Sequence, residues 1–221
     1  MKLEYSHFSE IGPRKNNEDC LRIVTIPTYN RTLFIVCDGM GGHSNGEIAS
    51  DTVSKTISAY WENTPKQDDS EQKVRDATIQ TCDMLDKQSL GYEMGTTMVL
   101  ASIENNKAMV THCGDSRCYI IDIKGNVKYR TIDHIDYSGY ITNCFFTGKS
   151  DLIEPDIRFV QLESYDRILL CTDGLYNAID DEMLLHTLHC ALDVRQVGEK
   201  YRTICQDKAS DNYTAIIIEI Q

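Results

Sequence analysis

The sequence contains little that would divide a chain or carry it into a membrane. Its 221 residues include only four prolines, and no Pro-rich linker, internal repeat or long charge run interrupts them. We therefore expect a single domain over residues 1–221, large enough to bury one sizeable core. No apolar stretch approaches the length of a membrane span, and the opening residues MKLEYSHFSEIG have no apolar signal core. We expect a cytoplasmic protein that makes no membrane contact.

Basic residues are scarce relative to acidic ones. Lys and Arg together number 22 and Asp and Glu 34, which gives a formal net charge of −12. A chain of this charge repels phosphate backbones, so we expect no nucleic-acid partner. Acidity of this size is otherwise common, and it becomes informative only if some aspartates converge on a metal ion.

Cysteine pairs are also missing. The nine cysteines are an odd number and none forms a CxxC motif, which argues against a disulfide framework and against a zinc site. Cys37, Cys171 and Cys205 lie inside apolar runs, where a free thiol behaves as a small hydrophobic group. This usage is typical of a reducing compartment.

Short apolar runs rich in β-branched residues predict strands. They lie at residues 3–8, 20–26, 32–37, 96–103, 108–113, 118–123, 127–132, 157–162, 167–172 and 213–220. Their hairpin-like spacing favours antiparallel pairing.

Helical periodicity marks two long and two short segments between these strands. A long helix is expected from about residue 48, with Ser44 and Glu47 as a capping box, and a second at about 71–89. Two shorter helices are expected at 180–192 and 194–206. Runs of strands broken by helix pairs predict an α+β fold with two sheets and helices packed outside them.

Aspartates stand at several predicted strand ends. Asp38, Asp115 and Asp173 each follow an apolar strand, and Asp19 and Asp211 each precede one. A single strand-end aspartate is usually a turn former. Several that meet at one rim of two facing sheets would repel one another, and a divalent cation is the usual compensation. Oxygen ligands without paired His or Cys indicate Mg²⁺ or Mn²⁺ rather than zinc.

The glycines beside Asp38 fit the same interpretation. The segment FIVCDGMGGHSNGEIAS (34–50) allows the backbone to approach an ion closely, so the Gly39 carbonyl is a candidate ligand. It matches neither GxxxxGK[ST] nor GxGxxG, the glycine motifs of nucleotide-binding loops.

Seven segments stand in an order that is typical of one enzyme family. They are GPRKNNED (12–19), VCDGMGGHSNGEIAS (36–50), GTTMVLASI (95–103), CGDSRCYI (113–120), TIDH (131–134), LLCTDGLYNAI (169–179) and SDNYTAIII (210–218). Over essentially its whole length the sequence resembles the metal-dependent protein phosphatases of type 2C, the PPM family, and its bacterial members in particular. The resemblance implies a four-layer α-β-β-α sandwich, with two central antiparallel sheets flanked by helix pairs.

The resemblance also implies a centre with two Mn²⁺ or Mg²⁺ ions. Asp38 would bridge both ions, and the Gly39 carbonyl would bind one of them. Asp173 and Asp211 would hold the other ion, while Asp19, with Glu18 beside it, would act on the second ion directly or through water. Asp115 matches a position that helps to bind a weaker third ion in bacterial relatives.

The same resemblance implies the reaction. A water activated by the two ions would attack a phosphoserine or phosphothreonine, and Arg14 would hold the substrate phosphate. His43 is the candidate proton donor to the leaving group, and a solvated loop histidine is its alternative interpretation. The expected partner is a phosphorylated protein substrate, opposite a serine/threonine kinase, and the expected state is a monomer.

A cysteine-nucleophile mechanism is the competing phosphatase chemistry. It needs an arginine five residues after the cysteine, whereas CGDSR places Arg117 only four residues after Cys113. We therefore interpret Arg117 as structural or salt-bridged, and we assign His134 to structure.

Two departures from the family pattern bear on substrate choice. Met40 stands where animal members carry histidine, although bacterial relatives also have methionine. Only IDYSGYIT (135–142) follows TIDH, where family members usually insert a flap of some thirty residues, so we expect a more open cleft. Two other functions stay open: an inactive phosphatase-fold binding module, and a phosphoesterase for small phosphorylated molecules.

Overall fold

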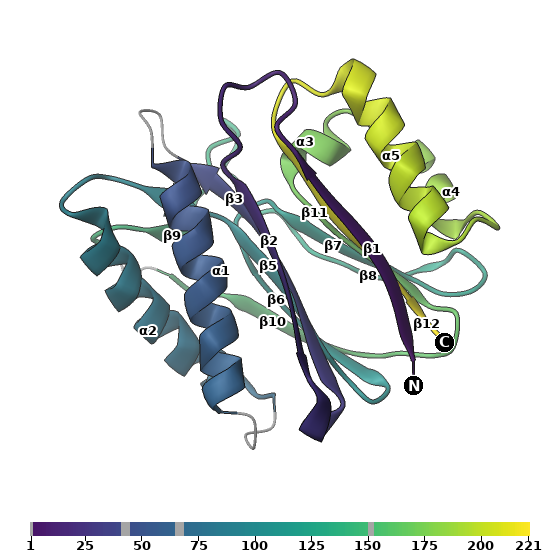
Figure 1. Ribbon diagram of the computed structural model, residues 1–221, viewed down its shortest axis with the longest axis horizontal. Coiled ribbons are helices and arrows are strands. Elements are labelled where there is room, and N and C mark those ends of the chain that lie inside the picture. The colour runs from purple at the N-terminus through teal and green to yellow at the C-terminus, as the bar shows by residue number, and fades with distance from the viewer. Residues whose placement is uncertain (1, 41–44, 65–68, 150–152) are drawn as a thin grey trace.

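A computed structural model describes residues 2–40, 45–64, 69–149 and 153–221. Its elements form four layers (Figure 1). Helices α1 (Gly46–Asn63) and α2 (Glu71–Ser89) cover one outer face, and α4 (Asp181–His189) and α5 (Val194–Lys208) cover the other. Two antiparallel sheets lie between the helix pairs, so the predicted α+β four-layer sandwich is confirmed.

The sheet beside α4 and α5 has five strands in the order β1-β12-β11-β7-β8. Their bounds are β1 Leu3–Glu10, β7 Arg117–Ile121, β8 Val127–Arg130, β11 Arg167–Cys171 and β12 Tyr213–Ile220. In β12 the run Ile216, Ile217 and Ile218 is fully buried, because this strand is covered on both faces.

The sheet beside α1 and α2 has seven strands, with the path β10-β6-β5-β3-β4-β9 and β2 paired to β3. Their bounds are β2 Asp19–Ile26, β3 Arg31–Met40, β4 Gly95–Thr96, β5 Met98–Glu104, β6 Lys107–Cys113, β9 Phe145–Phe146 and β10 Asp156–Gln161. A short 3-10 turn η1 (Pro27–Tyr29) joins β2 to β3, and a one-turn helix α3 (Asp173–Tyr176) follows β11.

Three hydrophobic clusters hold the layers together. Along β3, Phe34 and Val36 point into the cluster between the sheets, whereas Leu33, Ile35 and Cys37 point toward α1 and α2. This is the two-residue period of a strand, with both faces apolar because both are covered. The third cluster lies beneath α4 and α5 and contains Cys171 and Cys205, so these cysteines pack as predicted.

The helix starts differ in part from prediction. Helix α1 has Asn45 as its N-cap, with no side-chain cap bond from that residue. Ser44, and with it the predicted capping box with Glu47, lies outside the described residues. A capping box is present at the start of α5, where Asp193 and Gln196 exchange bonds. None of the helices in the described ranges is long and apolar enough to cross a membrane.

Several predicted strands have other bounds in the structure, and two of these differences have a visible local form. The strand expected at 118–123 stops at Ile121, because the Asp122 carboxylate accepts from the backbone N–H groups of Lys124 and Asn126 and forms a turn. The strand expected at 96–103 is divided at Thr97 into β4 and β5.

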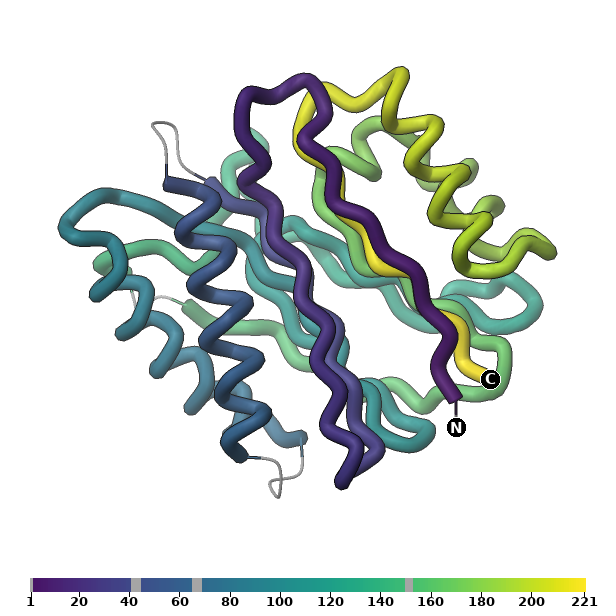
Figure 2. The backbone as a smooth tube through the Cα atoms, in the orientation of Figure 1, coloured from purple at the N-terminus to yellow at the C-terminus, as the bar shows by residue number. Residues whose placement is uncertain are grey.

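The strand ends that carry the predicted aspartates gather at one edge of the sandwich. The β1–β2 loop and the segment that leads into β12 run side by side there, at the top of the tube in Figure 2. The end of β3, the β6–β7 turn and the start of α3 also reach this edge, where they contribute to the pocket described next. The topology thus brings residues more than 190 positions apart in sequence into contact.

Candidate metal centre

A pocket of about 590 Å³ opens at this edge of the sheets. Its lining residues are Arg14, Lys15, Asn16, Glu18, Asp38, Gly39, Met40, Asp115, Ile141, Asp173, Asp211 and Asn212. The structure therefore brings together every predicted ligand except Asp19, which lies beside the pocket rather than in its lining. His43, the predicted proton donor, lies outside the described residues.

Asp38 and Asp19 stand directly opposite each other on β3 and β2. The Asp38 backbone is fixed from the other side, since its N–H donates to Thr97 Oγ1 at 3.0 Å and its carbonyl accepts from Thr96 Oγ1 at 2.8 Å. Asp19 Oδ2 accepts from Thr172 Oγ1 at 2.9 Å. Its other oxygen, Oδ1, is buried and has no hydrogen-bond partner. Such an orphaned carboxylate oxygen is costly unless a ligand meets it.

Asp173 reaches the pocket from the end of the five-stranded sheet, and Asp115 from the β6–β7 turn, which links the two sheets. Asp173 is the first residue of α3, and its Oδ2 accepts from Asn177 Nδ2 at 3.2 Å. Asp115 sits in the turn after β6, where Tyr176 Oη donates to its backbone carbonyl at 3.1 Å. Helix α3 therefore fixes one aspartate with its first residue and supports the other with its last.

Asp211 and Arg14 meet across the β1–β2 loop. Arg14 Nη2 lies 2.5 Å from Asp211 Oδ2, and Arg14 Nε donates to the Ser210 carbonyl at 3.3 Å. The guanidinium is still about half exposed, with 56% of its side chain accessible, so its remaining donors face solvent. A permanently charged fork thus stands at the mouth of a carboxylate-lined pocket.

The carboxylates share a low-dielectric site, and this raises their pKa values. Burial raises the pKa of Asp38 well above its usual range, and the charges of Asp19 and Asp173 add to the effect. Burial is also the main cause that raises the pKa of Asp19 to about 7 and that of Asp173 to about 6. The pKa values of Asp115 and Glu18 are raised for the same first reason.

The donor set fits hard divalent cations. All candidate side-chain ligands are carboxylates, whose mutual repulsion and desolvation are relieved when a cation binds among them. Among the candidate ligands, Asp19 Oδ1 is a buried oxygen without a hydrogen-bond partner, and a bound cation would satisfy it. Oxygen-only donors favour Mg²⁺ or Mn²⁺ over zinc or copper.

Position 39 requires a glycine, because the backbone of two other segments lies against it. A Cβ built on Gly39 would overlap the carbonyls of Gly46 and Glu18, so no larger residue fits without moving the start of α1. The Gly39 N–H donates to the Glu18 carbonyl at 3.1 Å. This packing holds the end of β3 against the Glu18 segment and leaves the Gly39 residue in the pocket lining.

A separate group of potential ligands comprises His112, His134 and Asp156, whose ligand atoms lie within 4.8 Å of one another. The two imidazole rings are stacked, with centroids 4.5 Å apart and planes 13° from parallel. An ion bound by an imidazole lies in the plane of its ring, and two stacked rings do not share such a point. His134 Nδ1 accepts from the Gly114 N–H at 3.2 Å, which leaves its proton on the Nε2 that faces Asp156. The group therefore supports the loop before Asp115, in agreement with a structural His134.

The cysteine-nucleophile alternative fails on geometry. Cys113 is fully buried, and burial raises the pKa of its thiol well above the usual range. Arg117, as predicted, is salt-bridged: it forms a two-pronged ion pair with Asp133, with Nε–Oδ1 at 2.9 Å and Nη2–Oδ2 at 2.6 Å. Neither residue lines the pocket.

Sequence reasoning missed Asn212 as a site residue. Its Nδ2 donates to the carbonyls of Ile11 at 2.7 Å and Asn16 at 2.9 Å, and its Oδ1 accepts from the Glu18 N–H at 2.9 Å. This side chain holds the Arg14–Glu18 loop against the start of β12. An asparagine beside Asp211 was visible in SDNYTAIII, but nothing local indicates a bond that spans 194 residues.

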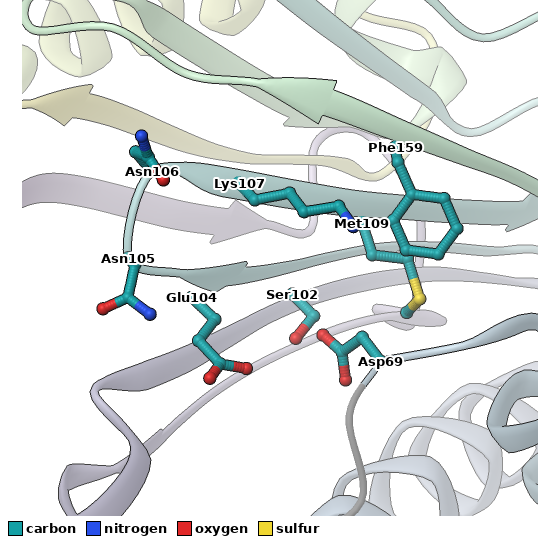
Figure 3. Close-up of a pocket in the computed structure, with 8 residues that line it drawn as sticks. All are labelled: Asp69, Ser102, Glu104, Asn105, Asn106, Lys107, Met109 and Phe159. Carbon is teal, nitrogen blue, oxygen red and sulfur yellow. The ribbon is translucent and has the colours of Figure 1, made fainter.

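A second cavity, of about 450 Å³, lies at the opposite end of the seven-stranded sheet (Figure 3). Lys107 Nζ lies 4.2 Å from the centroid of the Phe159 ring, and Glu104 is ion-paired to the buried Arg31 at 2.5 Å. Asp69 accepts from Trp61 Nε1 at 2.9 Å. The two carboxylates that line this cavity, Glu104 and Asp69, therefore bind side chains of the sheet and of helix α1 and are not placed as catalytic groups.

Comparison with known proteins agrees with this geometry. The family model described as protein phosphatase 2C matches residues 9–209. The chain is 32% identical over 203 residues to protein phosphatase PhpP of Streptococcus pneumoniae, covering 80% of each protein. It is 26% identical over 268 residues to a putative protein phosphatase of Mycoplasma genitalium, covering 100% of this chain and 98% of that relative.

Solved structures show the same fold. A serine/threonine phosphatase of S. agalactiae superposes with a TM-score of 0.86 at 23% identity, covering 100% of both chains. A bacterial serine phosphatase superposes with a TM-score of 0.82 at 27% identity, covering 100% of this chain and 98% of that one. As its sequence motifs predicted, the chain is a phosphatase that belongs to the protein phosphatase 2C family.

Proposed function

We propose that this phosphatase hydrolyses phosphoserine and phosphothreonine in proteins, with two Mn²⁺ or Mg²⁺ ions in the pocket around Asp38. The observation that carries the proposal is the convergence of buried carboxylates with raised pKa values beside one exposed guanidinium. A site of this kind is unstable without cations and selective for phosphorylated ligands once they are bound.

The residues that would hold the ions are those that line or back the pocket. They are Asp38, the Gly39 carbonyl, Asp173, Asp211, Asp19 and Glu18, with Asp115 as a contributor to a weaker third site. The bound ions would supply a nucleophilic water at neutral pH and neutralise charge on the phosphoryl oxygens.

Arg14 would bind the phosphate through its remaining N–H donors. Its bond to the Ser210 carbonyl fixes the Nε edge of the guanidinium, so the side chain is already oriented over the pocket. Lys15 also lines the pocket and adds a second positive charge at the same rim. A dianionic phosphate is thereby favoured over neutral ligands.

His43 remains the proposed proton donor to the serine or threonine alkoxide. In sequence it follows two glycines, between Asp38 and the residues that form helix α1. A general acid of this kind contributes on the order of 10²–10⁴-fold to the rate. His43→Gln should lower kcat for a peptide far more than for p-nitrophenyl phosphate, whose leaving group needs no proton.

The physiological substrate would be a phosphoprotein, and the enzyme would oppose a serine/threonine kinase. In this proposal it acts in the cytoplasm as a monomer. The short segment at 135–142 would leave the pocket more open than a full-length flap, which would suit a peptide chain that has to pass through the site.

Hydrolysis of a phosphothreonine peptide and of p-nitrophenyl phosphate tests the proposal. Each is measured with Mn²⁺, with Mg²⁺ and with EDTA, and with Asp173→Ala as the matched inactive variant. We expect metal-dependent turnover of both substrates that EDTA and the substitution abolish, with preference for the peptide. Turnover of p-nitrophenyl phosphate alone would favour a small-molecule phosphoesterase, and no turnover of either by a folded protein would refute an active enzyme.

A further inference from the structure

A cavity of about 440 Å³ adjoins the candidate catalytic pocket. We call it the side groove, and its lining includes Met40, Tyr140, Ile141, Phe146, Lys149 and Ile153. Met40 and Ile141 line both the side groove and the catalytic pocket, so the two cavities are neighbours with a common wall. A peptide whose phosphorylated residue enters the pocket has this groove within reach of its next residues.

One wall of the side groove is a tightly bonded turn over residues 135–141. Ile135 and Ile141 form an antiparallel bridge, and the Asp136 carboxylate accepts from the backbone N–H groups of Ser138 at 2.8 Å and Tyr140 at 3.0 Å. The Asp136 N–H donates to the Tyr140 carbonyl at 2.9 Å. These bonds order the turn before any ligand arrives, which lowers the entropy cost of binding.

Two residues that line the side groove, Asn143 and Phe146, belong to segments anchored elsewhere in the fold. Asn143 Nδ2 donates to the Glu154 carbonyl at 2.7 Å and also lies 3.3 Å from His134 Nδ1. Phe146 lies on β9, which pairs with β4 through Gly95. The groove is therefore a formed surface between two anchored segments.

The turn exposes aromatic surface beside the groove. Tyr140 is 74% exposed and lines the groove, whereas Tyr137 is fully exposed in the same turn and does not line it. Ile141 and Ile153 add aliphatic surface to the same cavity. An exposed tyrosine over aliphatic walls is the composition of a site that buries a large apolar side chain.

Three basic side chains stand around the pocket and the side groove, although the protein as a whole is acidic. The chain carries a net charge of −12, yet Arg14 and Lys15 stand at the pocket and Lys149 stands in the groove. Lys149 Nζ lies 4.8 Å from the centroid of the Phe146 ring, and within the described ranges no carboxylate is ion-paired to it. A ligand carboxylate that enters the groove would meet this positive charge.

We propose that the side groove selects phosphopeptide substrates in which a large apolar residue flanks the phosphorylated residue, with an acidic residue beyond it beside Lys149. This inference rests on the proposed function, because it assigns the groove to the same substrate that the pocket dephosphorylates. The shared wall of Met40 and Ile141 favours this occupant over a second copy of the chain or a separate small ligand.

The test is a set of phosphothreonine peptides with three residues on each side in an alanine and serine background. Each flanking position in turn is made Leu, Tyr, Glu, Lys or Ser, and kcat/KM is compared with that for p-nitrophenyl phosphate. On one side of the phosphothreonine, Leu or Tyr should raise kcat/KM roughly tenfold. Glu beyond it should add about threefold at low salt and less at high salt.

Four variants then locate the preference. Tyr140→Ala should remove most of the gain from the apolar residue, and Lys149→Glu should convert the preference for Glu into one for Lys. Tyr137→Ala, in the same turn but outside the groove, and Lys124→Glu, in the distant β7–β8 turn, should leave both preferences unchanged. The same peptides are also labelled with fluorescein. Fluorescence polarisation then measures their binding to the groove separately from turnover.

The outcomes separate the two proposals. A flat peptide profile in an enzyme that turns over p-nitrophenyl phosphate overturns the groove and leaves the phosphatase intact. Equal losses in Tyr137→Ala and Tyr140→Ala also overturn it. Absence of all turnover refutes the proposed function. If, in that case, the labelled peptides also bind wild type and Tyr140→Ala equally well, the role of the side groove in selecting peptides is overturned too.

Discussion

Without metal ions, the buried carboxylates should make the protein less stable as the pH rises. The pKa of Asp19 is raised from 3.8 to about 7, so the folded protein holds a proton that the unfolded chain has already lost over this range. Stability is therefore greatest at the acid end of this range and falls as the pH passes through the folded pKa.

The size of this loss follows from the shift. Each pKa unit corresponds to about 1.4 kcal/mol, and about two units of the Asp19 shift lie between pH 5 and its folded pKa of about 7. Asp173, with a pKa of about 6, titrates in the same interval, but the repulsion between the two groups is shared rather than additive. We expect a loss of about 3 kcal/mol between pH 5 and pH 8, or about 6–12 °C in Tm for a chain of this length.

Thermal unfolding in EDTA, followed by circular dichroism from pH 5 to pH 8, measures the effect. Addition of Mn²⁺ at pH 8 should raise Tm again, because a hundredfold excess over the dissociation constant adds about 2.7 kcal/mol to the free energy of unfolding. Asp19→Asn should flatten the pH dependence in EDTA and raise Tm at pH 8. Asp156→Asn, at a carboxylate that is 60% exposed, is the control and should keep the wild-type slope. A Tm in EDTA that is constant or rises from pH 5 to pH 8 would refute the reasoning.

Substitutions at three further positions test other parts of the account. Arg14→Ala should lower kcat/KM for a phosphothreonine peptide by about 100-fold, and Arg14→Lys by less, because a lysine keeps the charge but not the fork; equal rates for wild type and Arg14→Ala would contradict phosphate binding by this residue. Cys113→Ala should keep activity within about threefold, since the buried thiol takes no part in the chemistry, and an inactive but folded variant would reopen the cysteine mechanism. Asp69→Ala should lower stability by about 3 kcal/mol, because it removes the carboxylate between the buried Arg31 and Lys73; an unchanged denaturation midpoint would show that the network is not stabilising.

The sequence could predict the site residues because their signal is local. An apolar run that ends in Asp and Gly is readable without the fold, and this was true for Asp38 and Asp173. The layers were likewise predictable from strand and helix periodicity. What places Asp19 opposite Asp38 is the register of β2 and β3, and this follows from pairing rather than from either segment alone.

Other parts of the site depend on contacts between distant segments. Thr172 donates to Asp19 across 153 positions in sequence. Asn212, just before β12, donates to the Asn16 carbonyl and so holds the β1–β2 loop in place. The side groove could not be predicted either, because the shortened segment at 135–142 indicates only that something is missing. Its shape depends on how Asp136 closes the turn and on which strands Phe146 and Asn143 contact.

Anomalous scattering from crystals grown with Mn²⁺ tests the central claim most directly. We predict two manganese peaks in the pocket, among Asp38, Asp173 and Asp211, and their loss in crystals of Asp38→Asn. Absence of any peak in this pocket, or a peak only beside the stacked His112 and His134, would contradict the account.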